Sequence, residues 1–140
     1  MSLDPKVREF AAENHKAVLS TFRRDGATQM SIVTTGPLRD GVAFSTTLDR
    51  AKLRNLERDS RCSLLVSKDD WWGYVVLEGR AQIISSKTSS PGELRDTMRD
   101  VYRAAAGKEH PDWDEYDEVM RKEDRATVIV VPDVVYGTAL

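Results

Sequence analysis

The chain from Ala17 to Thr35 reads AVLSTFRRDGATQMSIVTT, and this stretch decides the fold. Two runs rich in apolar and β-branched residues flank the pair Asp25-Gly26, which is a strong signal for a tight hairpin turn. A turn from 36 to 41 follows, and a third run of strand character then extends from 42 to 47. Three short antiparallel strands in succession predict a meander.

The remaining chain adds strands and helices to this meander. Apolar runs predict strands at 62–67 and 74–84 and a closing strand from 126 to 137, which we expect to be broken at Pro132. Capping residues and helical spacing predict helices at 5–14, from Arg50 onward, at 91–106 and at 113–120. About six strands with inserted helices indicate a mainly β fold, a small closed or nearly closed barrel.

Composition limits the class of protein. A chain of 140 residues predicts one domain spanning 1–140. The 21 basic and 23 acidic residues leave a net charge of -2, which argues against nucleic acid as a partner. Cys62 is the single cysteine, so no internal disulfide is possible. We find no signal-peptide pattern and no run long enough to span a membrane, and we therefore expect a cytoplasmic protein that does not bind membranes.

Side chains that could act as a nucleophile, an acid/base pair or a metal cluster are scarce. His15 and His110 are the only histidines, and neither stands beside a plausible nucleophile. His110 is most simply part of a segment that leads into the helix after Asp112. The sequence therefore predicts no catalytic side chain and no metal ligand, which favours chemistry carried by a bound cofactor.

The segment Asp49 to Leu56 follows a predicted strand and begins a predicted helix, which places Arg50 and Lys52 at a strand-to-helix junction. A helix N-terminus leaves several backbone N–H groups unpaired and carries partial positive charge, so it favours anions. A compact anion such as a phosphate over the first turn could meet both cations. The alternative is an ordinary charged surface helix.

Two further features leave alternatives open. Alternation in the second strand places Gln29 and Ser31 on one polar face, which is either a solvent face or a surface that hydrogen-bonds a heteroaromatic ring. Hydroxyl groups also gather at 45–47, just before the basic junction. The pair Trp71-Trp72 is either an interface element or a core anchor beneath a loop.

Taken together, these residues resemble the split β-barrel flavin and deazaflavin oxidoreductases of the pyridoxamine 5'-phosphate oxidase-like superfamily, most closely the B branch of F420-dependent reductases. The motifs that carry the resemblance are RAKLRNLERDSR from Arg50 to Arg61, DDWWGY from Asp69 to Tyr74, EGRA from Glu78 to Ala81, WDEY from Trp113 to Tyr116, and VYG from Val135 to Gly137. The Arg-x-Arg-Leu motif with which pyridoxamine phosphate oxidases bind substrate phosphate is absent from the chain end, so we do not expect vitamin oxidase activity.

The resemblance implies a six-stranded, FMN-binding type of split β-barrel that forms a homodimer with cofactor sites at the subunit interface. It implies coenzyme F420, or alternatively FMN, as cofactor. The residues implied to bind the cofactor phosphate are Arg50, Ala51 and Lys52. The residues implied to contact the ring are Gln29, Ser31, Ser45, Thr46 and Thr47, with Trp72 and Tyr74 contributed by the partner subunit.

The expected activity is hydride transfer from reduced F420 to a small unsaturated acceptor, such as an enone, a quinone-like molecule or a tetrapyrrole. Two alternatives remain at this point. One is an FMN-dependent oxidoreductase, and the other is a non-catalytic module that binds a flavin or a haem.

Overall fold

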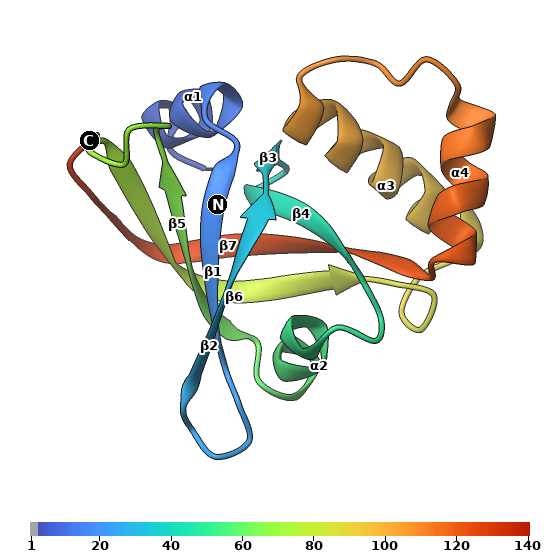
Figure 1. The fold of residues 1–140 in the computed structure, drawn as a ribbon, viewed down its shortest axis with the longest axis horizontal. Coiled ribbons are helices and arrows are strands. Elements are labelled where there is room, and N and C mark those ends of the chain that lie inside the picture. The colour runs from blue at the N-terminus through green and yellow to red at the C-terminus, as the bar shows by residue number, and fades with distance from the viewer. Residues whose placement is uncertain (1–2) are drawn as a thin grey trace.

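Seven strands form one antiparallel sheet in residues 3–140, the part of the chain described by the computed structural model. The strands are β1 (Lys16–Phe22), β2 (Thr28–Thr34), β3 (Gly36–Leu38), β4 (Gly41–Thr47), β5 (Arg61–Ser67), β6 (Tyr74–Ile84) and β7 (Arg125–Tyr136), in the spatial order β2-β1-β5-β6-β7-β4-β3. The sheet curls strongly and encloses its own core as a half-barrel (Figure 1). The predicted mainly β, split-barrel fold is therefore confirmed.

Four helices accompany this sheet within the described residues: α1 (Pro5–Glu13), α2 (Ala51–Arg58), α3 (Pro91–Ala106) and α4 (Trp113–Lys122). The predicted caps form, because the side chains of Asp4, Ser90 and Asp112 each accept a hydrogen bond from a first-turn N–H. Helix α3 ends at Gly107, whose left-handed φ of 71° suits glycine. None of these helices combines the length and the apolar composition that a membrane span requires.

The strand count is seven rather than six because part of the predicted turn at 36–41 is a strand. Residues Gly36–Leu38 pair with the start of β4 in an antiparallel register. Gly36 lies against the backbone of α3, where an added Cβ would stand 2.2 Å from the carbonyl of Ala104. Glycine at this position therefore lets a short edge strand pass directly beneath α3.

The predicted break at Pro132 is wrong, since β7 runs continuously from Arg125 to Tyr136. The β6–β7 register shifts between Glu78 and Gly79, opposite Pro132. A proline cannot donate a ladder hydrogen bond, and a bulge is one of the few places in a sheet that accepts it. The pairing leaves Asp133 of β7 without a partner on β6, and this bulge explains why the strand can include proline.

The polar face of β2 is not a solvent face. Val33 and Thr35, which share that face with Gln29 and Ser31, are buried. On the opposite face Met30 and Ile32 are 65% and 72% exposed. Strand alternation indicates which residues share a face but not which face is directed inward, so the sequence left this choice open.

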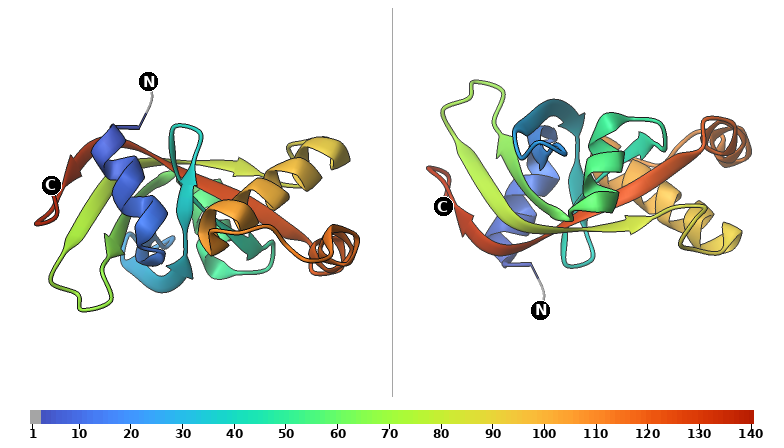
Figure 2. Two further views of the ribbon diagram at one scale, coloured as in Figure 1. Left: turned by 90° about the horizontal axis from the view of Figure 1, so that it is seen from above. Right: turned by 90° about the horizontal axis from the view of Figure 1, so that it is seen from below.

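Two separate hydrophobic clusters hold the molecule together. The larger fills the half-barrel and includes Phe44 from β4 and Leu53 and Leu56 from α2. The smaller lies on the other side of β4 and β7, where Ala43 and Ile129 pack against Val101 of α3. The hairpin of α3 and α4 is therefore attached outside the barrel and projects to one side (Figures 1 and 2).

Candidate functional site

A cleft of about 750 Å³ lies between the half-barrel and the α3–α4 hairpin. One wall, here called the barrel wall, comes from β4, the start of α2 and the start of β7, and consists of Ser45, Thr46, Thr47, Arg50, Lys52 and Arg125. The facing wall, here called the helical wall, consists of Val101, Tyr102, Ala105, Ala106, His110, Glu115, Tyr116, Val119 and Met120. The end of β2 closes one side with Ile32, Val33 and Thr34.

Helix α2 presents an uncapped N-terminus to this cleft. Its N-cap residue, Arg50, has an extended backbone and makes no side-chain capping bond, unlike the caps of the other three helices described. Within residues 3–140, the N–H groups of Ala51 and Lys52 have no hydrogen-bond partner. Leu53 and Leu56 bury the opposite face of the helix in the main core and fix its position. Unpaired N–H groups and two cations therefore meet at one point.

Lys52 is half-buried and has no acidic partner among the described residues. Burial, followed by the positive charge of Arg50, lowers the pKa of Lys52. A bound anion would offset both effects, because it would neutralise the two cations and replace the lost hydration. The local chemistry thus fits a phosphate group at this position.

The hydroxyl groups of β4 continue the barrel wall. Ser45 and Thr47 are half-buried, whereas Thr46 between them is 5% exposed. Thr47 Oγ1 donates a hydrogen bond to Asp49, which lowers the pKa of that carboxyl. Arg125 Nη1 donates to Ser45 Oγ over 3.2 Å, which adds a third cation that the sequence analysis did not identify.

The helical wall is held by specific polar contacts. Arg99 of α3 pairs with Asp117 of α4, with Nε 3.0 Å from Oδ1. The hydroxyl of Tyr116 donates to the carbonyl of Met98 over 2.7 Å, and burial raises the pKa of this tyrosine to about 12. These contacts fix α4 on α3 and keep the Tyr116 hydroxyl engaged within the hairpin.

Not every predicted residue reaches the cleft. Arg50, Lys52 and residues 45–47 line it together, whereas Gln29 and Ser31 do not. Gln29 Oε1 instead accepts a hydrogen bond from Asn55 over 2.9 Å, in a separate depression that also contains Ala51 and Arg58. Both residues lie nearer the β1–β2 turn than Ile32, Val33 and Thr34, which are the β2 residues that reach the cleft.

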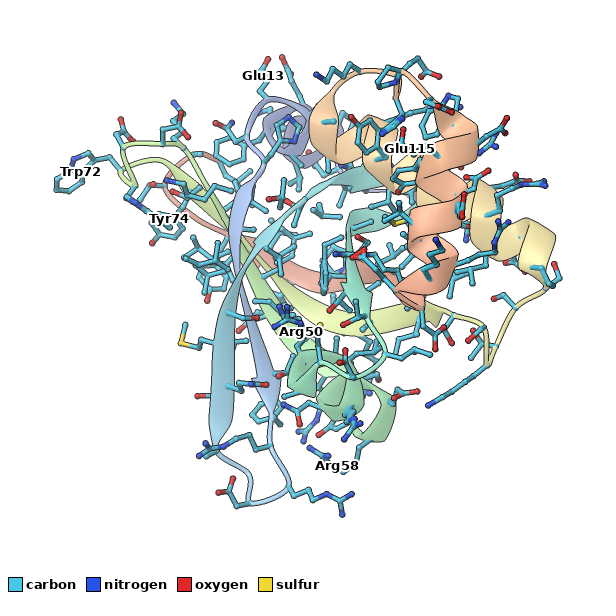
Figure 3. The ribbon with its side chains drawn as sticks, turned by 45° about the vertical axis from the view of Figure 1, so that its right-hand side comes forward. Glu13, Arg50, Arg58, Trp72, Tyr74 and Glu115 are labelled. Atoms are coloured by element: carbon cyan, nitrogen blue, oxygen red, sulfur yellow. The ribbon has the colours of Figure 1, made fainter. Side chains whose placement is uncertain are left out.

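Trp72 and Tyr74 lie near the β5–β6 turn, on the opposite side of the molecule from Glu115 of the cleft (Figure 3). Trp72 is 83% exposed, so it is not a core anchor. Trp71 has a left-handed φ of 68° and lies beneath Lys16, whose Nζ is 4.8 Å from the ring centroid. The turn therefore projects Trp72 away from the body of the molecule.

The residues that sequence reasoning missed are those of the helical wall, above all Tyr102 and His110, together with Arg125 of the barrel wall. The capping signal at Asp112 correctly placed His110 just before a helix. No local pattern indicates that this helix folds back over β4, because that depends on contacts between residues distant in sequence, such as Val101 with Ala43.

Comparison with known proteins identifies relatives. The family model described as "Pyridoxamine 5'-phosphate oxidase" matches residues 3–138. A conserved hypothetical protein from Mycobacterium tuberculosis aligns with a TM-score of 0.78 at 20% identity, over 98% of this chain and 84% of that one. An F420 reductase aligns with a TM-score of 0.63 at 19% identity, over 92% and 94%.

A third structure widens the range of ligands among proteins of this fold. HutZ, described as the heme storage protein from Vibrio cholerae, aligns with a TM-score of 0.65 at 15% identity, over 98% of this chain and 95% of that one. Likeness at such low identity establishes the shared fold alone. The ligand of this chain must therefore be argued from its own residues.

Proposed function

The chain belongs to the pyridoxamine 5'-phosphate oxidase family, and on that premise we propose that it is an oxidoreductase that uses the deazaflavin F420 in the cleft. Reduced F420, when bound, supplies a hydride, which a small unsaturated acceptor receives. The protein's part is to hold the cofactor, orient the acceptor and exclude water. The whole chain acts as one domain in this proposal.

The observation that carries the proposal is the uncapped start of α2 with its unpaired N–H groups and two cations, Arg50 and Lys52. These groups would bind the cofactor phosphate. The hydroxyls at Ser45, Thr46 and Thr47 adjoin them and would hydrogen-bond the polar edge of the ring system. Gln29 supports the site through its hydrogen bond with Asn55 of α2, and Ser31 lies on the same face of β2 as Gln29.

The cofactor is tested by titrating the purified protein in parallel with oxidised F420, FMN and hemin, followed by fluorescence or absorbance. We expect saturable binding of F420 with the highest affinity. FMN is the alternative, because it presents the same phosphate and a similar tricyclic ring. Preference for FMN would change the cofactor but keep the phosphate site, and preference for hemin would overturn the proposal.

The phosphate site is tested with Arg50→Ala and Lys52→Ala. Each variant removes a charge-assisted hydrogen bond, so each should lose about 1.5 to 3 kcal/mol of binding free energy. Arg54→Ala is the matched control, since Arg54 lies on the same helix but outside the cleft. Equal losses in all three variants would indicate a general charge effect and not a phosphate site.

We also propose that two copies of the chain complete the site as a homodimer. The outer face of the sheet carries an apolar row that crosses five strands through directly paired residues: Ile32, Val18, Leu65, Val76 and Tyr136. Its ends are the exposed side chains Ile32 and Tyr136, and Ile32 also lines the cleft. An exposed apolar row beside the site suits a second copy that covers it.

A mixing experiment tests whether Trp72 and Tyr74 serve the partner's cleft. Trp72→Ala and Lys52→Ala should each bind cofactor weakly as pure dimers. If the tryptophan acts across the interface, a mixed dimer contains one site with both changes and one site with neither. Refolding the two variants together should therefore restore full-affinity binding at one site in each mixed dimer. No recovery on mixing would show that Trp72 does not serve the partner's cleft.

A further inference from the structure

Three rings of the helical wall, those of Tyr102, His110 and Tyr116, form a cluster with the ring of Trp113 behind them. His110 contacts the other three, with ring centroids 4.9 Å from Tyr102, 5.3 Å from Tyr116 and 5.7 Å from Trp113. Three aromatic neighbours at these distances restrict the rotation of the imidazole. The ring is therefore held in one position at the surface of the cleft.

A hydrogen bond also fixes which nitrogen carries the proton. The backbone N–H of Asp112 donates to Nδ1 of His110 over 2.9 Å. Asp112 is itself held as the N-cap of α4, because its Oδ1 accepts a hydrogen bond from the N–H of Glu115 over 3.1 Å. A nitrogen that accepts a hydrogen bond carries no proton, so the proton of the neutral ring is on Nε2.

Nε2 reaches the molecular surface of a residue that lines the cleft. No residue from 3 to 140 forms a hydrogen bond with Nε2, although His110 is only half-exposed. No buried side-chain nitrogen or oxygen in this range lacks a partner, so Nε2 must reach the molecular surface. Because His110 lines the cleft, its Nε2–H is available to a ligand there.

The surroundings indicate the kind of ligand. The cations Arg50, Lys52 and Arg125 are all on the barrel wall, whereas the charged side chain on the helical wall is the carboxylate of Glu115. A neutral N–H on a wall whose charged side chain is a carboxylate does not favour an anion. Tyr102 and the small residues Ala105 and Ala106 form an apolar surface next to it, which suits a flat ring.

We propose that His110 is a neutral hydrogen-bond donor that selects acceptors bearing a ring carbonyl, such as enones and quinones. The carbonyl oxygen accepts from Nε2–H while the ring of the acceptor packs on Tyr102. The inference rests on the proposed function only in treating this ligand as the hydride acceptor. The binding site itself does not depend on which cofactor occupies the barrel wall.

The same geometry disfavours His110 as a ligand to haem iron. A histidine that binds a metal through Nε2 normally carries its proton on Nδ1 and donates it to a neighbour. Here Nδ1 accepts from the Asp112 N–H, so iron binding through Nε2 would require that hydrogen bond to break. This tautomer therefore suits a site that binds a carbonyl group and does not suit a site that binds haem iron.

The two histidines of the chain make a direct test possible. His15 Nδ1 lies 2.7 Å from the carbonyl oxygen of Thr35, which can only accept, so His15 should carry its proton on Nδ1. Imidazole nitrogen NMR at mildly alkaline pH, without cofactor, should thus show two opposite tautomers. The variant His110→Phe assigns the signals. A proton on Nδ1 of His110 would overturn the proposal.

Ligand binding is then followed in the same experiment with menadione, a bicyclic quinone, and with methylnaphthalene, which has a similar ring system without carbonyl oxygens. Menadione should shift the His110 nitrogen signals and leave those of His15 unchanged. His110→Phe keeps an aromatic ring and removes the donor. It should weaken menadione binding by about tenfold, the size of one neutral hydrogen bond, and change methylnaphthalene binding by less than about twofold.

If His110→Phe weakened the binding of menadione and of methylnaphthalene equally, His110 would have a packing role only, and the proposal would be overturned. Unchanged His110 nitrogen signals on addition of menadione would also overturn the proposed site. Both readouts are obtained without cofactor, so they are independent of the F420 titration. Failure of F420 binding with a normal menadione response would refute the proposed function and leave the carbonyl site intact.

Discussion

The two walls of the cleft are built differently. The barrel wall stands on β4 and α2, whose buried side chains Phe44, Leu53 and Leu56 belong to the main core. The helical wall stands on α3 and α4, which pack outside the barrel on a smaller cluster around Val101 and on the polar contacts of Arg99 and Tyr116. The barrel wall is thus part of the fold, whereas the helical wall is attached to it.

This difference suggests a division of roles. A cofactor phosphate requires a fixed constellation of donors, and the barrel wall supplies one whose position is set by the core. An acceptor requires a surface that can differ between relatives without disturbing the barrel. Substitutions that alter the stability or the ligand binding of one wall and not of the other therefore test this comparison.

The largest effect is expected for Leu53→Ala, which removes a fully buried side chain beneath α2. It should lower the free energy of unfolding by about 3 kcal/mol, because it removes apolar burial and leaves a cavity. Denaturant unfolding measures the loss. Val119→Ala on α4, where the side chain is 41% exposed, is the control and should change stability by less than about 0.5 kcal/mol. Similar losses in both variants would contradict the distinction between the walls.

A smaller effect is expected for Tyr116→Phe in the helical wall. The variant keeps the aromatic packing and removes the hydroxyl that donates to Met98, which should cost about 1 kcal/mol of stability. It should weaken the attachment of α4 and leave cofactor affinity unchanged, since the barrel wall is untouched. Thermal unfolding and cofactor titration measured together check this. Loss of cofactor affinity would mean that the two walls are coupled.

The smallest effect is expected for Asp117→Asn, and it depends on pH. The Arg99 guanidinium lowers the pKa of Asp117 below its ordinary value of 3.8, so the ion pair stabilises the folded state above this pH. This contribution is lost as the pH falls through the lower, folded-state pKa. The difference in Tm between wild type and variant should therefore be present at neutral pH and shrink in acid.

The control for this variant is Asp25→Asn, which removes an exposed partner 3.6 Å from Arg23 on the β1–β2 hairpin. Its effect on Tm should be small at every pH, because exposed pairs are screened by solvent. A constant Tm difference for Asp117→Asn from neutral to acid pH would show that the ion pair with Arg99 does not stabilise the α3–α4 hairpin.

Local features were predictable because their causes lie within a few residues. The turn at Asp25-Gly26 forms with Gly26 at a φ of 85°, and the caps at Ser90 and Asp112 form as expected. The junction at Arg50 and Lys52 was also evident, since it requires only that a strand be followed by a helix. Each of these signals depends on backbone groups that are neighbours in sequence.

The inward direction of the β2 polar face and the composition of the helical wall were not predictable in this way. Whether Gln29 or Met30 faces the core depends on what packs against the strand, and alternation alone treats both cases equally. The presence of His110 in the cleft depends on the position of α3 across β4, where residues nearly sixty positions apart in sequence pack together.

By itself, the sequence determined six of the seven strands, the helices with their caps, and the cationic junction that suits a phosphate. Only the tertiary structure decided what faces that junction. Helix caps and turns involve neighbours in sequence, whereas the burial of apolar side chains brings together residues that are distant in sequence. The curled sheet brought Arg50 and Lys52 to one wall, and the α3–α4 hairpin brought His110 and Tyr102 to the other. A histidine that is unremarkable in the sequence thereby lies in a cleft with one nitrogen fixed and the other free to bind.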